Sequence, residues 1–209
     1  MKDYKTEQEH FWTGQFGDEY TVRNNTQELI DGNIYFFSSI LSKTEGIHSI
    51  IEFGSNIGLN LIAIRKLLND VELSGIEINE HAVKSLKNIE GVKAYHQSIF
   101  DFKPDYKRDL VFTKSVLIHI NPRKLALVYD LLYETSQRYI CLAEYHNPTP
   151  VEVNYRGHSD RLFKRDFAGE MLDRFPSLNL IDYGFFYSRD TRYYDDTCWF
   201  LLERSDAKA

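Results

Sequence analysis

The chain has 209 residues, of which 43% are hydrophobic, and a formal net charge of −6. Its length and apolar content predict one domain with a sizeable core, and its acidic balance argues against a broad nucleic-acid-binding face. The N-terminus is polar, and no apolar run is long enough to span a bilayer, so we expect a cytoplasmic protein without a membrane segment. Cys141 and Cys198 lie in apolar stretches without metal-ligand spacing, which indicates free thiols in a reducing compartment.

Residues 1–25 are rich in aromatic and polar side chains but have no clear period. Phe11, Trp12 and Tyr20 are followed by Arg23 and Asn24. Two interpretations are open: a loose arm packed on the surface, or a lid that folds over a ligand. From residue 26 to residue 42, apolar side chains recur at helical spacing after a capping Asn or Thr.

Short apolar runs then alternate with helical patterns. Strands are expected at 50–53, 71–78, 91–95, 109–113 and 139–143, and helices at 58–68, 81–87 and 122–132. This alternation predicts an α/β domain with a parallel sheet and right-handed crossovers.

The last third of the chain has a different pattern. Residues 147–164 contain two prolines, a glycine and scattered polar groups, which we interpret as a functional loop on the acceptor side of the site. A helix is expected at 165–175. The apolar runs 178–187 and 193–203 are joined by so short a connection that they must pair antiparallel.

The first predicted strand leads into the turn Glu52-x-Gly54-x-x-x-Gly58. Glycine permits the tight bend and lets a ligand approach the main chain. A dinucleotide-binding turn has three glycines in Gly-x-Gly-x-x-Gly, and here the third is missing. Glu77, at the end of the second strand, suits a carboxylate that accepts both ribose hydroxyls. A ribose without a pyrophosphate indicates S-adenosylmethionine.

This order of motifs resembles the class I S-adenosylmethionine-dependent methyltransferases. The resemblance implies a Rossmann-like fold for residues 26–204. Its seven-stranded, mostly parallel sheet would have an antiparallel C-terminal strand pair and helices on both faces. Residues 1–25 would form the aromatic arm or lid, and residues 205–209 a tail.

A narrower resemblance is carried by Phe11-Trp12-x-Gly14-x-Phe16-Gly17-Asp18-x-Tyr20-x-x-Arg23-Asn24 and by residues 164–172. These segments are similar to methylases associated with pseudaminic acid biosynthesis, which accompany bacterial surface-glycan pathways. This resemblance implies an anionic sugar, or a nucleotide-activated sugar, as the methyl acceptor.

The broader resemblance also implies roles for single residues. The methionine end of the cofactor would be bordered by Glu52, Gly54, Ser55, Asn56, Gly58 and Lys114. Glu77 would hold the ribose, Ile78 would lie against the adenine, and Ser98 and Ile99 would form the pocket for the adenine amino group. Many relatives have Asp where Ser98 stands. Arg23 or Asn24 would bind the methionine carboxylate, and the Tyr20 ring would stabilise the sulfonium.

The candidate catalytic residues follow the fourth and fifth strands. His119 is the first candidate for a general base, with a structural histidine at a helix start as the alternative. Glu144 and Tyr145 face the same predicted cleft, with a polar strand end as the alternative. An anionic acceptor would need no base.

Positive side chains in and after the predicted loop suit an anionic small molecule. His146, Arg156 and Lys164 are the candidate substrate-binding residues, although a solvated charged loop would look the same. No His/Asp cluster has catalytic-metal spacing. The alternative functions are a carboxyl or phosphate-ester methyltransferase and a non-catalytic S-adenosylmethionine-binding protein. Monomer and dimer are both open.

Overall fold

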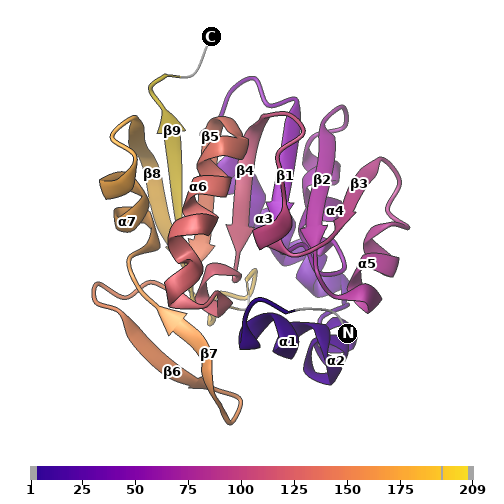
Figure 1. Ribbon diagram of the computed structural model, residues 1–209. Coiled ribbons are helices and arrows are strands. Elements are labelled where there is room, and N and C mark those ends of the chain that lie inside the picture. The colour runs from indigo at the N-terminus through magenta and orange to yellow at the C-terminus, as the bar shows by residue number, and fades with distance from the viewer. Residues whose placement is uncertain (1–3, 194, 207–209) are drawn as a thin grey trace.

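The computed structural model describes residues 4–193 and 195–206, which form a three-layer α/β domain (Figure 1). Its strands are β1 (Ser49–Phe53), β2 (Glu72–Glu77), β3 (Val92–His96), β4 (Arg108–Lys114), β5 (Ser136–Glu144), β6 (Val151–Tyr155), β7 (His158–Lys164), β8 (Leu178–Phe186) and β9 (Thr197–Arg204). Its α-helices are α1 (Glu7–Thr13), α2 (Gln15–Arg23), α3 (Gln27–Leu41), α4 (Leu59–Leu67), α5 (Glu80–Leu86), α6 (Leu125–Thr135) and α7 (Phe167–Arg174). Short 3-10 turns lie at η1 (Ile99–Asp101), η2 (Leu117–His119) and η3 (Pro122–Lys124).

The main sheet has seven strands in the order β3-β2-β1-β4-β5-β9-β8. The first five strands in this order are parallel, and β9 runs antiparallel to both β5 and β8. The prediction of a mostly parallel sheet with an antiparallel C-terminal pair is therefore confirmed. Because the strand order reverses beside β1 and β4, the carboxyl ends of these strands form the crevice where open α/β sheets bind ligands.

Each face of the sheet is covered by its own hydrophobic core. On one face, side chains of α6 and α7 such as Leu132 and Met171 pack on Ile51 and Val111. On the other face, Phe37 of α3 and several α4 side chains pack on the opposite sides of the same strands. Strands buried on both faces explain why β1 and β4 are continuous apolar runs in the sequence.

Two segments differ from the predictions. The aromatic arm is not irregular: it forms α1 and α2, which lie across the carboxyl end of the sheet (Figure 1). Residues 147–164 are not a long loop, because β6 and β7 form a hairpin joined at Tyr155 and His158. Arg156 and Gly157 both have positive φ angles, of 51° and 88°. This geometry is that of a two-residue type I′ turn, whose twist matches the flanking strands.

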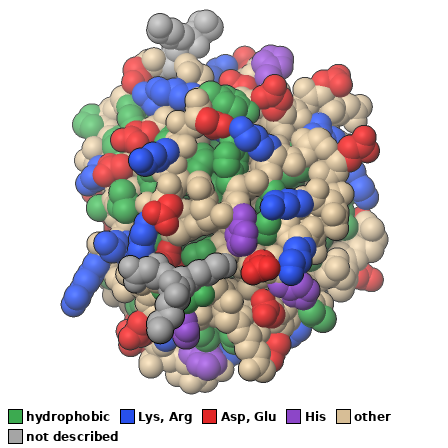
Figure 2. All heavy atoms as spheres, turned by 45° about the vertical axis from the view of Figure 1, so that its right-hand side comes forward, with side chains coloured by type: hydrophobic (Ala, Val, Ile, Leu, Met, Phe, Trp, Pro, Cys, Tyr) green, Lys and Arg blue, Asp and Glu red, His purple; other side chains and the backbone are tan. Residues whose placement is uncertain are grey.

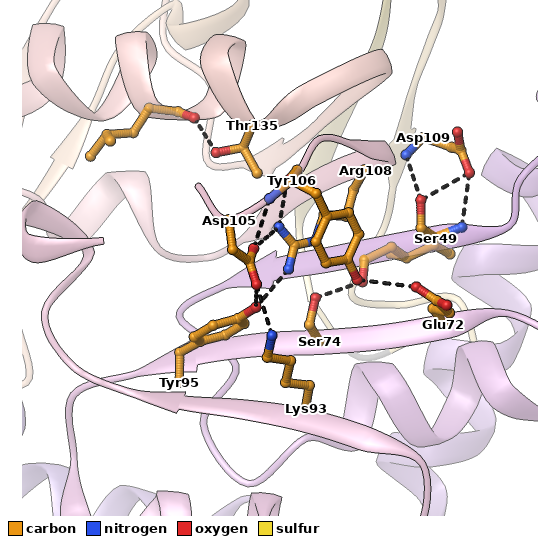
Figure 3. Close-up of polar contacts among 12 residues, drawn as sticks. Ser49, Glu72, Ser74, Lys93, Tyr95, Asp105, Tyr106, Arg108, Asp109 and Thr135 are labelled. Atoms are coloured by element: carbon orange, nitrogen blue, oxygen red, sulfur yellow. Dashed lines mark hydrogen bonds and ion pairs between the residues drawn. The ribbon is translucent and has the colours of Figure 1, made fainter. Parts of the chain in front are cut away.

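A polar cluster surrounds Arg108, the first residue of β4 (Figure 3). The fully buried Arg108 donates through Nη1 to Asp105 Oδ1 and to the Tyr106 carbonyl oxygen, both at 2.5 Å, and through Nη2 to the Tyr95 hydroxyl at 2.7 Å. Its guanidinium also lies 3.6 Å from the centroid of the Tyr106 ring. Lys93 Nζ donates to Asp105 Oδ2 at 2.7 Å. The cluster ties the start of β4 to β3.

Charged side chains of both signs are interspersed on the face shown in Figure 2. In the described part of the chain, no helix is long and apolar enough to cross a membrane. Within the same residues, no three His, Cys, Asp or Glu side chains form a group that could hold a metal ion.

Candidate functional site

A cavity of about 490 Å³ lies at the carboxyl ends of β1, β2 and β4, beneath α1 and α2. Its volume lies in the range of small-molecule sites. The predicted site residues that line it are Tyr20, Asn24, Gly54, Ser55, Asn56, Glu77, Ile78, Ser98, Ile99, Lys114, His119, Tyr145 and Arg156. Six predicted residues do not line it: Arg23, Glu52, Gly58, Glu144, His146 and Lys164.

The turn after β1 bends as its glycines suggested. Gly54 and Gly58 have φ angles of 79° and 85°. A Cβ on Gly54 would lie 2.6 Å from Val116 Cγ2, and one on Gly58 would lie 2.4 Å from Ile89 Cδ1. The backbone conformation and the neighbouring side chains therefore both favour glycine at these two positions.

Glu77 joins the end of β2 to this turn. Its Oε2 accepts a hydrogen bond from the Asn56 amide and its Oε1 accepts one from the Asn79 amide, both at 2.7 Å. Burial raises the pKa of the carboxyl group, and the backbone donors oppose that shift. Each carboxylate oxygen keeps a second lone pair, so this fixed side chain can accept further hydrogen bonds from a ligand.

Glu52 lies behind the cavity wall, in contact with the lining residue Asn60. Its Oε1 accepts from Asn60 Nδ2 at 2.5 Å, and its Oε2 has no partner among the described residues. Asn60 does line the cavity, and its Oδ1 is likewise buried without a described partner. Burial raises the pKa of Glu52 to about 8, although Asn60 and the positive charge of Lys114 oppose the shift.

His119 lines the cavity from η2 and contacts two aromatic rings. The ring centroids of Trp12 and Tyr155 lie 4.7 and 4.9 Å from its own. Its Nδ1 lies 2.5 Å from the carbonyl oxygen of Arg161 on β7. Because a carbonyl only accepts, Nδ1 carries the proton, and Nε2 is left as an acceptor. Burial lowers the pKa of the imidazole to about 4, so the ring is neutral near pH 7.

Glu144 is positioned differently from the prediction. Its carboxylate accepts hydrogen bonds from the amides of Val116, Leu117 and Ile118, at 3.1, 3.0 and 3.3 Å. Burial raises the pKa of this carboxyl to about 7 against those donors. The side chain is 3% exposed and outside the cavity lining, and its three hydrogen bonds hold η2 in place.

Tyr145 lines the cavity, but its hydroxyl is engaged. The hydroxyl donates to both carboxylate oxygens of Asp195, at 2.9 and 2.8 Å. Burial raises the pKa of the phenol, with the Asp195 charge adding to the shift. Tyr145 is therefore a neutral wall and hydrogen-bond donor, and not a base at neutral pH.

The predicted cations are mostly paired with the protein. Arg23 Nη1 lies 3.6 Å from Glu19 Oε2, its guanidinium lies 5.3 Å from the centroid of the Phe16 ring, and the residue does not line the cavity. Lys164 Nζ lies 5.2 Å from the centroid of the Tyr145 ring, and Lys164 does not line the cavity. His146 Nδ1 lies 3.8 Å from Asp166.

The sequence-based interpretation missed several residues of the cavity wall. They come from α1 to α4, from the N-cap of α5, from β6 and from the connection between β8 and β9: Glu9, Trp12, Thr21, Asn33, Asn60, Asn79, Tyr155, Tyr193 and Asp195. One signal was available. The segment Thr6-x-x-Glu9 is a capping-box pattern that predicts a helix start, and the Thr6 hydroxyl does accept from the Glu9 amide at 3.2 Å.

No protein-family model matches the chain, and no curated protein matches its sequence. Many solved structures match its fold. Magnesium protoporphyrin IX methyltransferase from Synechocystis PCC 6803, with bound S-adenosylhomocysteine, has a TM-score of 0.68 at 14% identity, over 97% of this chain and 100% of that chain.

Two further methyltransferase structures are similar in fold to this chain. The 1,6-didemethyltoxoflavin-N1-methyltransferase of Burkholderia thailandensis has a TM-score of 0.68 at 9% identity, over 95% of this chain and 87% of that chain. The plantazolicin methyltransferase BpumL has a TM-score of 0.66 at 13% identity, over 94% of this chain and 93% of that chain. The chain therefore has the Rossmann-like fold of S-adenosylmethionine-dependent methyltransferases.

Proposed function

We propose that the protein transfers a methyl group from S-adenosylmethionine to a small-molecule acceptor. The observation that carries the proposal is Glu77, a buried carboxylate fixed by two backbone amides at the carboxyl end of β2 and lining the cavity. This is the position from which α/β folds hold a ribose diol. The fold similarity to structures with bound S-adenosylhomocysteine supports the same assignment.

The residues present suit this cofactor. Glu77 would accept from the ribose hydroxyls, and Ile78 and Ile99 give apolar contact for a purine. The unpartnered Oδ1 of Asn60 is a ready acceptor for an ammonium group, and Lys114 is a cation in the same wall. When bound, S-adenosylmethionine supplies a methyl group already activated by its sulfonium.

The protein's own contribution is then mainly positioning and the exclusion of water. Alignment of two reactants in one site can lower a barrier by about 7–11 kcal/mol. The rings of Trp12 and Tyr20 line the cavity, and such rings stabilise a nearby cation by about 0.5–2 kcal/mol. The helices α1 and α2 carry these rings, so the N-terminal segment acts as the lid over the site.

His119 is proposed as the general base. Its Nε2 is the acceptor nitrogen of a neutral ring, and the Arg161 carbonyl fixes that tautomer. A base whose pKa is about 4 removes protons best from an acidic O–H or N–H, because transfer from a weakly acidic alcohol would be strongly uphill. For an acceptor that is already anionic, His119 would only orient it.

The identity of the acceptor is a finer proposal. Arg156 and Lys114 line the cavity and favour an anionic group, in keeping with the sugar acceptor that the narrower resemblance implies. Other cations of the segment are engaged: Arg161 faces Glu7, and Arg165 donates to Glu170 at 2.6 Å. The similar structures are methyltransferases for magnesium protoporphyrin IX, for 1,6-didemethyltoxoflavin and for plantazolicin, so this fold does not fix the acceptor.

The test is release of S-adenosylhomocysteine in the presence of a panel of acceptors: activated sugars, carboxylates, phosphate monoesters and heteroaromatic N–H and O–H compounds. Turnover with one class, lost in His119→Ala, supports the proposal for an acceptor that needs a base. Binding of the cofactor without turnover on any class would favour the alternative of a non-catalytic S-adenosylmethionine-binding protein.

A further inference from the structure

Helix α1 carries a carboxylate into the end of the cavity beside β3. Glu9 lines the cavity together with Ser98 and Ile99, which follow β3, with Glu77, which ends β2, and with Ile78, which follows it. Because β2 and β3 are neighbours in the sheet, these two groups of residues lie side by side. A carboxylate from the lid thus shares this end of the cavity with the residues proposed to hold the nucleoside.

The position of Glu9 is fixed from both sides. Its Oε1 accepts a hydrogen bond from the Ser98 hydroxyl, and its Oε2 accepts one from the Lys5 amide at 2.6 Å. Lys5 Nζ forms an ion pair with Asp101 in η1, so the start of α1 is anchored on the turn after β3. The Thr6 hydroxyl caps the same helix at the Glu9 amide. The carboxylate is therefore held in one place before any ligand arrives.

Ser98 itself has little left to offer a ligand. Its single hydroxyl proton is donated to Glu9, and its oxygen accepts from the Phe100 amide at 3.0 Å. A carboxylate, in contrast, has about four lone-pair sites, of which these contacts use two. Beside β3, Glu9 accordingly offers the free acceptor sites that Ser98 lacks, and as a carboxylate it can only accept.

We propose that Glu9 recognises the 6-amino group of the cofactor's adenine. The inference rests on the proposed function, and it assigns the selection of the base to the N-terminal helix. An amino group donates two N–H bonds and suits a carboxylate, whereas the 6-oxo group of hypoxanthine presents lone pairs that the carboxylate repels. Since the contact joins α1 to the cofactor, binding of the cofactor also holds the lid against β3.

The experiment is a calorimetric titration of the full chain with two ligands, S-adenosylhomocysteine and its 6-oxo counterpart S-inosylhomocysteine. The variants are Glu9→Gln and the matched control Glu7→Gln, which changes an exposed carboxylate on the same turn of α1. The quantity compared is the ratio of the two dissociation constants. If part of a variant is unfolded, the apparent number of binding sites falls equally for both ligands, so the ratio of the two dissociation constants does not change.

Wild type and Glu7→Gln should prefer the adenine ligand by roughly 10- to 100-fold, the range expected for one charge-assisted hydrogen bond. In Glu9→Gln the preference should fall to about threefold or less, because the amide N–H can donate to the 6-oxo group. A Glu9→Gln protein that keeps the wild-type preference would overturn the inference and leave the proposed function intact. A wild-type protein that binds neither ligand would overturn both.

Discussion

The buried carboxyl of Glu52 makes the stability of this protein depend on pH in a direction that can be measured. Its side chain is 0% exposed, one oxygen has no described partner, and burial raises its pKa from 4.5 to about 8. The informative change is Glu52→Gln. Glutamine has nearly the same shape, keeps an oxygen for the Asn60 amide group, and cannot ionise.

The sign and size follow from linkage. A carboxyl whose folded-state pKa is raised contributes stability that is fully present below pH 4.5 and is lost as the pH rises toward 8. The whole shift corresponds to roughly 5 kcal/mol, of which about 3–4 kcal/mol falls between pH 5 and pH 8. Glu52→Gln should therefore gain about 3–4 kcal/mol in free energy of unfolding relative to wild type across that interval.

The assay is urea unfolding of wild type, Glu52→Gln and the control Glu134→Gln at a series of pH values. Glu134 is exposed on α6, so its replacement should leave the pH dependence of the wild type unchanged. A difference between wild type and Glu52→Gln that stays constant within about 0.5 kcal/mol over this range would refute the reasoning, because Glu52 would then be ionised throughout.

Three further predictions concern the site and the far end of the sheet. For an acceptor whose proton His119 removes, the acidic limb of kcat/KM should have its midpoint near pH 4, and a midpoint near 6.5 would contradict the buried, neutral imidazole. Glu144→Gln should lower the free energy of unfolding by about 1–3 kcal/mol, because the glutamine amide group cannot accept from all three backbone amides. An unchanged urea midpoint would contradict this prediction. Arg108→Lys should lower the free energy of unfolding by about 3 kcal/mol or more, because lysine lacks the forked guanidinium that donates to both Asp105 and Tyr95. The affinity for S-adenosylhomocysteine should stay unchanged. A loss of that affinity would show that the cluster around Arg108 is coupled to the cavity.

The central fold could be predicted because its signals are local. β1 and β4 are apolar runs, and Gly54 and Gly58 mark the turn between strand and helix. The order of such elements then restricts the topology. Glu77 was identified for the same reason, since its distance from the turn is set by one helix and one strand.

The predictions that differ from the structure concern residues whose conformation or role is set by tertiary contacts. The aromatic residues of the N-terminal segment obscure the helical period that begins after Thr6. Pro148 and Pro150 favour the prediction of a loop, although the strands of a hairpin follow them directly. Glu144 and Arg23 have suitable chemistry for the roles predicted for them. Their partners, the amides of η2 and the Glu19 carboxylate, become visible only in three dimensions. Glu9 belongs to the capping box that begins at Thr6, which predicts a helix start but not the contact of that helix with the cavity, and Asp195 lies in a connection without a motif.

The central claim is that this cavity binds S-adenosylmethionine, and calorimetric titration with S-adenosylhomocysteine tests it most directly. The account predicts one saturable site per chain, with affinity reduced about tenfold or more in Glu77→Gln through loss of a charged acceptor. A folded wild-type protein that gives no binding heat and no rise in melting temperature with this ligand would contradict the account.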